Sequence, residues 1–403
     1  MRCKSPPQWL YYILLAPFFK PGILGVLDGT ELLEQIYDLW RLAAAAVIAI
    51  LYLRHWIRVK RMPSPVMLLL GVYLAFVALA TLIRENNLWR LMNHVLTILA
   101  FSMAVELRLR EDPMKAVDML LMPATVVVVL NFILECAFPW GLARGGSYNY
   151  TFNYIGIDNL LAPVLVPYMF LVVLGSHIRF GEVRWYAWAL VLAAAESLLL
   201  VWSATGLMGM AVALVFLLFF YRRRFQTWFN FTTAGLLSAG LFFGVVVFRL
   251  QNLFAFFIED VLHKGLSFTG RTDIWDRALF MFDRSPWLGY GIAQTGKVYR
   301  LAKHKYYHAH NMYLQVLIEG GVPALMAFLV MLERAGKKLL LVRKHPFACL
   351  LSAAWMAVFL MTSMEPFLDR NGLLIYALVF LSYYVEDLIR AAVPEQETEI
   401  TDE

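Results

Sequence analysis

The sequence predicts an all-α integral membrane protein with about twelve transmembrane helices and one long extracytoplasmic loop that carries short amphipathic helices. Of its 403 residues, 61% are hydrophobic and only 16% are charged. Soluble proteins are typically about 45–50% apolar and about a quarter charged, so a water-soluble enzyme and a disordered chain are both excluded. The apolar residues gather in runs of about twenty, the length that crosses a bilayer as a helix. Basic residues alternate between connections, as in multi-pass membrane proteins.

Twelve apolar runs are long enough to be transmembrane helices. They cover residues 8–27, 37–56, 64–83, 88–106, 114–137, 157–178, 185–202, 205–221, 227–249, 310–332, 346–364 and 371–390. The first run lacks the small-residue site of a cleaved signal peptide, which favours a retained span, although Lys20-Pro21-Gly22 interrupts it. The seventh and eighth are nearly continuous, so a tight turn is expected at Ser203-Ala204-Thr205-Gly206.

The distribution of positive charge predicts the topology. Alternate connections together carry 17 basic residues, whereas the opposite short connections hold only Arg84, Arg144 and Arg370. Lys and Arg are enriched on the cytoplasmic side, so both termini are expected in the cytoplasm of a cytoplasmic-membrane protein. The chain then divides into nine spans in 1–249, an extracytoplasmic loop in 250–309, three spans in 310–393 and a disordered acidic tail in 394–403.

The long connection at 250–309 departs from this charge pattern. It lies outside in the predicted topology, yet it holds eight basic residues against five acidic ones. Long outer segments are partly exempt from the charge rule, so a solvated loop is one interpretation. The other is an anion-binding site at the membrane face. Long loops in compact proteins are uncommon and usually functional, which favours the second interpretation.

Residues 272–283 of this loop have helical spacing. Trp275, Leu279 and Phe282 fall on one face, which predicts an amphipathic helix at the outer interface. Arg271 stands at its entrance, where free backbone N–H groups also favour anions. A guanidinium matches phosphate oxygens in pairs, so Arg271 is a candidate diphosphate clamp, with a lipid-headgroup contact as the alternative.

After this helix, Pro286 is expected to end the helical segment. Gly289-Tyr290-Gly291 then allows a sharp turn close to another backbone.

Two histidines, His308 and His310, stand at the end of the loop. No carboxylate or cysteine accompanies them at ligand spacing, and the three cysteines of the chain are far apart, so neither a metal nor a cofactor is expected. His310 opens the tenth span, and a helix N-terminus disfavours imidazolium. A neutral imidazole at the membrane boundary is suited to take a proton from a hydroxyl group.

A polar stripe follows on the tenth span, where Asn311, Gln315 and Glu319 recur at four-residue steps. A carboxyl that deep in an apolar helix is costly unless it is paired or hydrated, and structural pairing between helices is the simpler interpretation. Gly320-Gly321 permits close helix approach, and Pro323 permits a kink. Other ionisable residues within or beside spans are candidates for a polar core: Arg41, Arg90, His94, Glu196 and Glu365.

These motifs resemble those of the bacterial O-antigen ligase and O-antigen polymerase superfamily. They read GR-x3-W, then P-x2-GYG, then H-x-HN-x-YLQ-x-L-x-E-x-G, over roughly residues 265–330. The resemblance implies a metal-independent membrane glycosyltransferase with a GT-C-like helical core. Such enzymes take glycans from undecaprenyl diphosphate at the outer face of the cytoplasmic membrane. The resemblance assigns the base that activates the acceptor hydroxyl to His310 and the donor-diphosphate contact to Arg271.

Further substrate contacts are expected on the same segment. They are Arg277, Arg284, Arg300, Lys303, His308, Asn311, Tyr313 and Glu319. One departure matters, because the family often has Ser-Arg before the eighth span and this chain has no arginine at 203–206. Other loop residues, such as Arg284, Arg300 or Lys303, are then expected to neutralise the phosphate.

The predicted function is therefore polymerisation of lipid-linked repeat units of O-antigen, capsule or exopolysaccharide. The missing arginine and the fairly short loop favour a polymerase over a ligase that moves a finished glycan onto another acceptor, such as lipid A core. A transporter or flippase of a lipid-linked glycan is a third alternative. Expected partners are the lipid-linked donor, the glycan acceptor, membrane lipids and a chain-length regulator, but no nucleic acid. Asp28 and Glu31 are an alternative metal site in the first outer loop.

Overall fold

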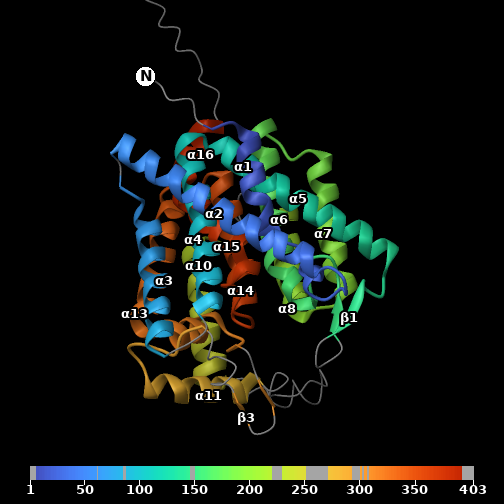
Figure 1. The fold of residues 1–403 in the computed structure, drawn as a ribbon. Helices are drawn as coiled ribbons and strands as arrows, with labels where there is room; N and C mark the ends of the chain where they lie inside the picture. Colours follow the sequence, from blue (N-terminus) through green and yellow to red (C-terminus); the bar gives the residue numbers. More distant parts are fainter. Residues whose placement is uncertain are drawn as a thin grey trace, which may run out of the picture.

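The computed structural model describes residues 6–60, 62–84, 88–145, 150–219, 229–250, 271–292, 300–301, 304–305 and 308–392. Helices dominate this part of the chain, which confirms the all-α class (Figure 1). The predicted tail at 394–403 lies outside the described residues, as does most of the segment 251–309 apart from the pieces named here. The proposed division into spans and loop stays a prediction.

The helices follow the predicted apolar runs. In chain order they are α1 (Gln8–Leu15), η1 (Ala16–Phe19), η2 (Gly22–Gly25), α2 (Glu31–Val59), α3 (Pro65–Ile83), α4 (Leu88–Glu111), α5 (Pro113–Ala137), α6 (Asp158–Phe180), α7 (Trp185–Val201), α8 (Ala204–Phe219), α10 (Phe231–Leu241), η3 (Phe242–Val247), α11 (Arg271–Arg284), α13 (Met312–Leu341), α14 (Pro346–Thr362), η6 (Arg370–Gly372), α15 (Leu373–Tyr383) and α16 (Val385–Ala392). A tight turn joins α7 and α8, but it lies at residues 202–203, since residues 204–206 of the expected turn already belong to α8.

Two short antiparallel hairpins were not predicted. One pairs β1 (Ala143–Gly145) with β2 (Tyr150–Phe152), and the other pairs β3 (Arg300–Leu301) with β4 (His304–Lys305). Each strand is too short to show an alternating apolar pattern in the sequence.

Six of the described helices are long and apolar enough to cross a membrane: α2, α3, α4, α5, α6 and α13. A seventh candidate is the pair formed by residues 370–383 and 385–392, which is bent by 71°. Five shorter apolar helices lie in the remaining predicted ranges. Each of the twelve ranges therefore contains apolar helix, but twelve crossings remain a prediction.

The first predicted span, 8–27, is not one continuous helix. Its helical pieces end at Phe19 and resume at Gly22. Between them Lys20 is buried and donates to Glu34 at 2.8 Å and to Asp38 at 3.0 Å. The proline at residue 21 lacks an N–H, and the ion pairs draw the chain toward α2, so the helix is interrupted.

Helix α6 occupies the centre of the bundle. Its most apolar stretch is 89% buried, and it packs against α5, α7, α8, α14 and α15. Peripheral helices instead expose large apolar side chains: Leu39 is 70% exposed, Ile57 72% and Leu218 69%. Exposed apolar surface on this scale marks a membrane-facing boundary, since water-soluble monomers rarely tolerate it.

Helix α13 is kinked, as Gly320-Gly321 and Pro323 predict. Gly321 has φ 72° and ψ −172°, outside the helical region. The Pro286–Gly291 turn docks on this break. The amides of Tyr290 and Gly291 donate to the carbonyls of Ile318 and Glu319 at 2.6 and 3.0 Å, and Val322 donates to Pro286 at 2.8 Å. Pro323 has no N–H to donate to the Glu319 carbonyl, and the Val322 amide donates to Pro286 instead of Ile318. The amides of Tyr290 and Gly291 supply the two missing donors.

The glycines of this turn are required by its geometry. A Cβ on Gly289, whose φ is 69°, would lie 2.7 Å from the Ile318 carbonyl oxygen. The predicted close backbone approach is therefore present.

Helix α11 lies across one end of the bundle, at the end opposite α16 (Figure 1). It begins one residue earlier than expected and is amphipathic. Ile274, Trp275 and Ala278 are buried against a small apolar cluster that includes Leu314 and Ile318 of α13. This packing fixes Arg271, the first helical residue, near the head of α13.

Candidate active site

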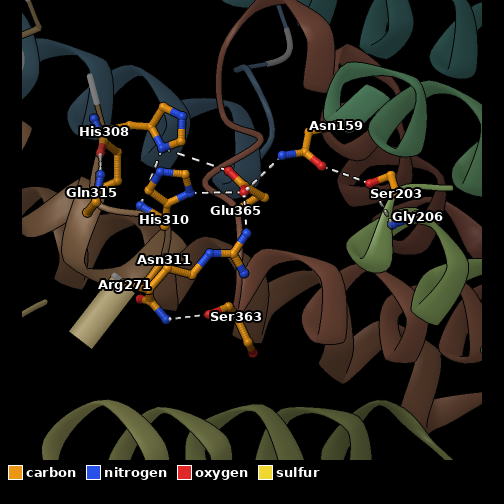
Figure 2. Close-up of polar contacts among 11 residues, drawn as sticks. Asn159, Ser203, Gly206, Arg271, His308, His310, Asn311, Gln315, Ser363 and Glu365 are labelled. Atoms are coloured by element: carbon orange, nitrogen blue, oxygen red, sulfur yellow. Dashed lines mark hydrogen bonds and ion pairs between the residues drawn. The ribbon is translucent and has the colours of Figure 1, made fainter. Parts of the chain in front are cut away.

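A buried carboxylate, Glu365, joins the two residues that the sequence singles out. Its side chain is 3% exposed and lies in the segment after α14. Its Oε1 accepts from the Arg271 guanidinium at 2.7 Å and lies 2.9 Å from Nδ1 of His310 (Figure 2). The loop arginine and histidine, 39 positions apart, are thus held on one oxygen atom.

The contact with Glu365 sets the chemistry of His310. An ionised carboxylate only accepts hydrogen bonds, so Nδ1 carries the proton and Nε2 of the neutral ring is left to accept one. His310 has φ 48°, an uncommon conformation for a residue other than glycine. Backbone strain of this kind concentrates at functional sites, where the surroundings enforce it.

The position of His310 corrects one expectation. Helix α13 begins at Met312 with Asn311 as its N-cap, so His310 precedes the helix rather than opening it. Its nearest electrostatic partner is the Glu365 carboxylate rather than the helix N-terminus.

Charge compensation keeps Glu365 ionised. Burial alone would raise the pKa of Glu365, but the hydrogen bond from His310, followed by electrostatic attraction to His310, His308 and Arg271, lowers it below its usual value. A buried anion held by a guanidinium and an imidazole is a stable positioning group for both.

His308 lies beside His310, with their ring centroids 4.0 Å apart. Its Nδ1 accepts the His310 amide at 3.3 Å and is 3.8 Å from Glu365. Burial, followed by the neighbouring His310, lowers the pKa of His308 to about 4. His308 is therefore neutral at physiological pH.

Asn311 and Gln315 position the two histidines. The Asn311 side chain accepts from the amides of Tyr313 and Leu314, at 3.0 and 3.1 Å, and donates to the Ser363 carbonyl at 3.0 Å. Gln315 accepts the Ala309 amide at 2.8 Å. These bonds tie the histidine segment to the head of α13 and to the segment that carries Glu365. Asn311 is fully buried, so it acts as a helix cap and tether.

A second chain of hydrogen bonds reaches Glu365 from the other side. Asn159, near the start of α6, donates to Glu365 at 3.3 Å and accepts from Ser203 at 2.8 Å (Figure 2). Ser203 stands just before α8, in the segment where the family often carries arginine. The structure thus brings this segment to the cluster through polar rather than charged groups.

The other predicted site residues fall in three places. Arg277 and Arg284 stack on Phe280, with guanidinium–ring distances of 5.2 and 4.4 Å. Tyr313 faces α10 and hydrogen-bonds Ser238 at 2.8 Å. Glu319 is buried and accepts from Gln315 at 2.7 Å. Lys303 and the side chain of Arg300 lie outside the described residues, so their roles stay predictions.

Two hollows flank the head of α13. A polar cavity of about 570 Å³ is lined by residues of α2, α4, α13 and the 366–371 segment, together with His308. An apolar groove of about 560 Å³ runs between α10 and α13, and Tyr313 lines it. His308 of the cluster thus lines the polar cavity, and Tyr313, three residues after His310, lines the apolar groove.

The histidine pair has a carboxylate partner that sequence spacing did not reveal. Nitrogen and oxygen atoms of His308, His310 and Glu365 lie within 4.8 Å of one another, an arrangement that could hold a metal ion. Spacing along the chain was thus an incomplete ground for excluding a metal. The Arg271 guanidinium on the same carboxylate oxygen disfavours a cation there, because the two positive charges would repel.

Comparison with protein families adds the decisive observation. Residues 188–329 match the family model described as O-antigen ligase. The matched range covers about a third of the chain, so this finding is a similarity over that segment. The match confirms the resemblance to the O-antigen ligase and polymerase superfamily and supports an enzyme. Together with the apolar helices, it indicates an integral membrane protein. No curated protein matches the chain.

The matched range includes Arg271, His308 and His310, but Asn159 and Glu365 lie outside it. The cluster is therefore completed by residues from both sides of the matched segment.

Proposed function

We propose that this protein polymerises undecaprenyl-diphosphate-linked oligosaccharide repeat units at the outer face of the cytoplasmic membrane. The main support for the proposal is that one carboxylate oxygen of Glu365 contacts both the Arg271 guanidinium and the His310 ring. An acid–base group and a phosphate-binding cation on one carboxylate suit glycosyl transfer from a lipid diphosphate.

The transfer step follows from this arrangement. His310 Nε2 takes the proton of an acceptor sugar hydroxyl as its oxygen attacks the anomeric carbon of the donor. The bond from that carbon to the diphosphate breaks with inversion, and the electron pair leaves on undecaprenyl diphosphate. Arg271 stabilises the phosphate charge, and Glu365 stabilises the imidazolium that forms. No metal is required by this step.

The apolar groove between α10 and α13 supports a lipid-linked donor. Phe242, Tyr313 and Leu317 line it, and a prenyl chain needs an apolar path that begins near the diphosphate. A transporter is less favoured because it has no need for a base and a phosphate clamp on one carboxylate.

The main alternative is a ligase, which the description of the matching family model favours. The absence of arginine at residues 203–206 supports the polymerase instead. Purified protein with a lipid-linked repeat unit as sole substrate separates the two. A ladder of products supports the polymerase, whereas product only after addition of a second acceptor, such as lipid A core, supports the ligase. Movement of the substrate across a vesicle membrane without transfer supports a transporter.

A further inference from the structure

The polar cavity beside His308 is lined by polar residues that have no role in the proposed transfer step. Arg41, Asn93, His94 and Asp369 line it, and Trp89 stands in its wall with 57% of its surface exposed. The volume of about 570 Å³ falls within the roughly 300–1,000 Å³ of small-molecule sites.

Two polar atoms in this wall lack a hydrogen-bond partner among the described residues. Arg41 is 4% exposed and bonds Asn93 at 3.2 Å and Asp38 at 3.0 Å, yet its Nε is unsatisfied. Nε2 of His94 is buried and unsatisfied as well. Leaving such groups unpaired costs about 1–3 kcal/mol each, so the polar character of this wall is maintained at a cost to stability.

From this we infer that the cavity is the binding site for the acceptor sugar, and the inference rests on the proposed function. The lining includes His308, which packs on the base His310, but does not include Arg271. In an inverting displacement the attacking hydroxyl and the departing phosphate lie on opposite sides of the reacting carbon. The acceptor is therefore expected on the side of His308 and His310, and the donor diphosphate on the side of Arg271.

The character of the lining specifies a pyranose rather than a lipid or a simple anion. Asp369 accepts hydrogen bonds, Arg41 donates them and Asn93 does both, which matches the mixed hydroxyls of a sugar ring. The Trp89 ring offers an apolar face for the C–H side of the sugar. The carboxylates of Asp38 and Asp369 lie among the three arginines of the lining, so the cavity is not a dedicated anion site.

The test separates the kinetics of the two substrates. The donor is a lipid-linked repeat unit, and the acceptor is the same oligosaccharide as a short alkyl glycoside, which has no diphosphate and cannot donate. Asn93→Ala and Trp89→Ala are expected to raise the KM for the acceptor about tenfold, the effect of one lost contact, and to leave the donor KM within about twofold.

A substitution that fills the cavity can be compared with the same substitution at the neighbouring position outside it. Thr97 is 3% exposed and lines the cavity, whereas its neighbour Leu96 is 36% exposed and is not part of the lining. Thr97→Phe is expected to abolish use of the glycoside acceptor, and Leu96→Phe is expected to behave as wild type. A rise in donor KM, or an unchanged acceptor KM in Asn93→Ala and Trp89→Ala, overturns the assignment. If wild type forms no product from the donor with any acceptor, the proposed function itself fails.

Discussion

Two buried carboxylates at opposite ends of the molecule, Glu106 and Glu365, show how similar ion clusters serve different purposes. Glu106 is fully buried near the end of α4. It accepts from the Tyr52 hydroxyl at 2.6 Å, the Ser64 amide at 2.9 Å and the Tyr384 hydroxyl at 2.9 Å, and Arg110 pairs with it at 2.7 Å. Arg110 is 17% exposed, but its Nε and one terminal nitrogen are bonded to Glu106, Tyr384 and the Met62 carbonyl, so this cluster joins helices.

Glu365 has equally close partners, but they retain unused capacity. Arg271 and His310 are each 21% exposed and come from the segment that caps the bundle. Among the described residues, no hydrogen bond uses Nε2 of His310 or the remaining guanidinium N–H groups of Arg271, which can therefore serve a ligand. A buried ion cluster therefore suggests a functional site when its partly exposed residues have hydrogen-bond donors and acceptors that are not used within the protein.

The largest expected effect is loss of transfer in His310→Ala. General-base catalysis is typically worth about 10²- to 10⁴-fold, and we expect a loss of that size without unfolding, since the ring is partly exposed. Initial rates in proteoliposomes measure it, with His55→Ala at the opposite end as the control. Near-normal rates in His310→Ala would remove the base assignment.

Next is Glu106→Ala, which is expected to act on stability instead of chemistry. Removing one partner of a buried pair costs about 3–5 kcal/mol, because Arg110 and the two tyrosines lose their acceptor. Thermal unfolding in detergent measures this loss. The rate per folded molecule is expected to stay near wild type, and a selective loss of turnover would break the contrast between the two clusters.

A smaller effect is expected for Arg271→Lys. A point charge cannot reproduce the paired contacts of a guanidinium, so we expect a roughly 10- to 100-fold rise in the KM for the donor. Arg249→Lys is the matched control, since Arg249 lies near α11 and pairs with Asp276 instead of Glu365. Equal effects in both variants would indicate general electrostatics in place of a specific clamp.

Acidification is expected to loosen the Glu365 cluster gradually. The pKa of His308 is lowered from 6.5 to about 4, so its contribution to stability is lost as pH falls from about 6.5 toward 4. Glu365, whose pKa is also lowered, loses its contribution only below the ordinary carboxyl range. Amide exchange of residues 308–315 between pH 7 and pH 4.5 reports this change. His308→Gln is expected to flatten the profile, and an unaltered profile in that variant contradicts the assignment.

The smallest effect is expected from metal removal. Activity should be unchanged in excess EDTA, because Arg271 already supplies the positive charge at Glu365. Loss of activity that Mg²⁺ or Mn²⁺ restores would contradict this and would direct attention to Asp28 and Glu31, or to the histidine pair.

Periodicity and apolar length predicted most of the helical framework, because lipid selects long apolar runs directly. These two signals failed at the first predicted span. There, Lys20 forms ion pairs with Glu34 and Asp38, and the helix is interrupted. The kink of α13 and its docking turn followed from Gly321, Pro323 and the 286–291 motif, since these residues have few backbone alternatives.

The site was only partly predictable. Arg271 and His310 carry recognisable motifs, but Glu365 lies 55 positions from His310, and sequence spacing does not reveal such a contact. A lone acid at the end of an apolar run was the only available signal. The burial of Trp275 fixes which face of α11 packs on the bundle. Arg277 and Arg284 project from a different face of the helix than Arg271.

The docking of the 286–291 turn on the break in α13 has a consequence for substrate entry. Three backbone bonds join the two segments, so α11 cannot rise from the bundle without breaking pairs that water must then replace. A substrate that entered between α11 and α13 would have to break these bonds, so we expect entry from the plane of the bilayer or through the two flanking hollows.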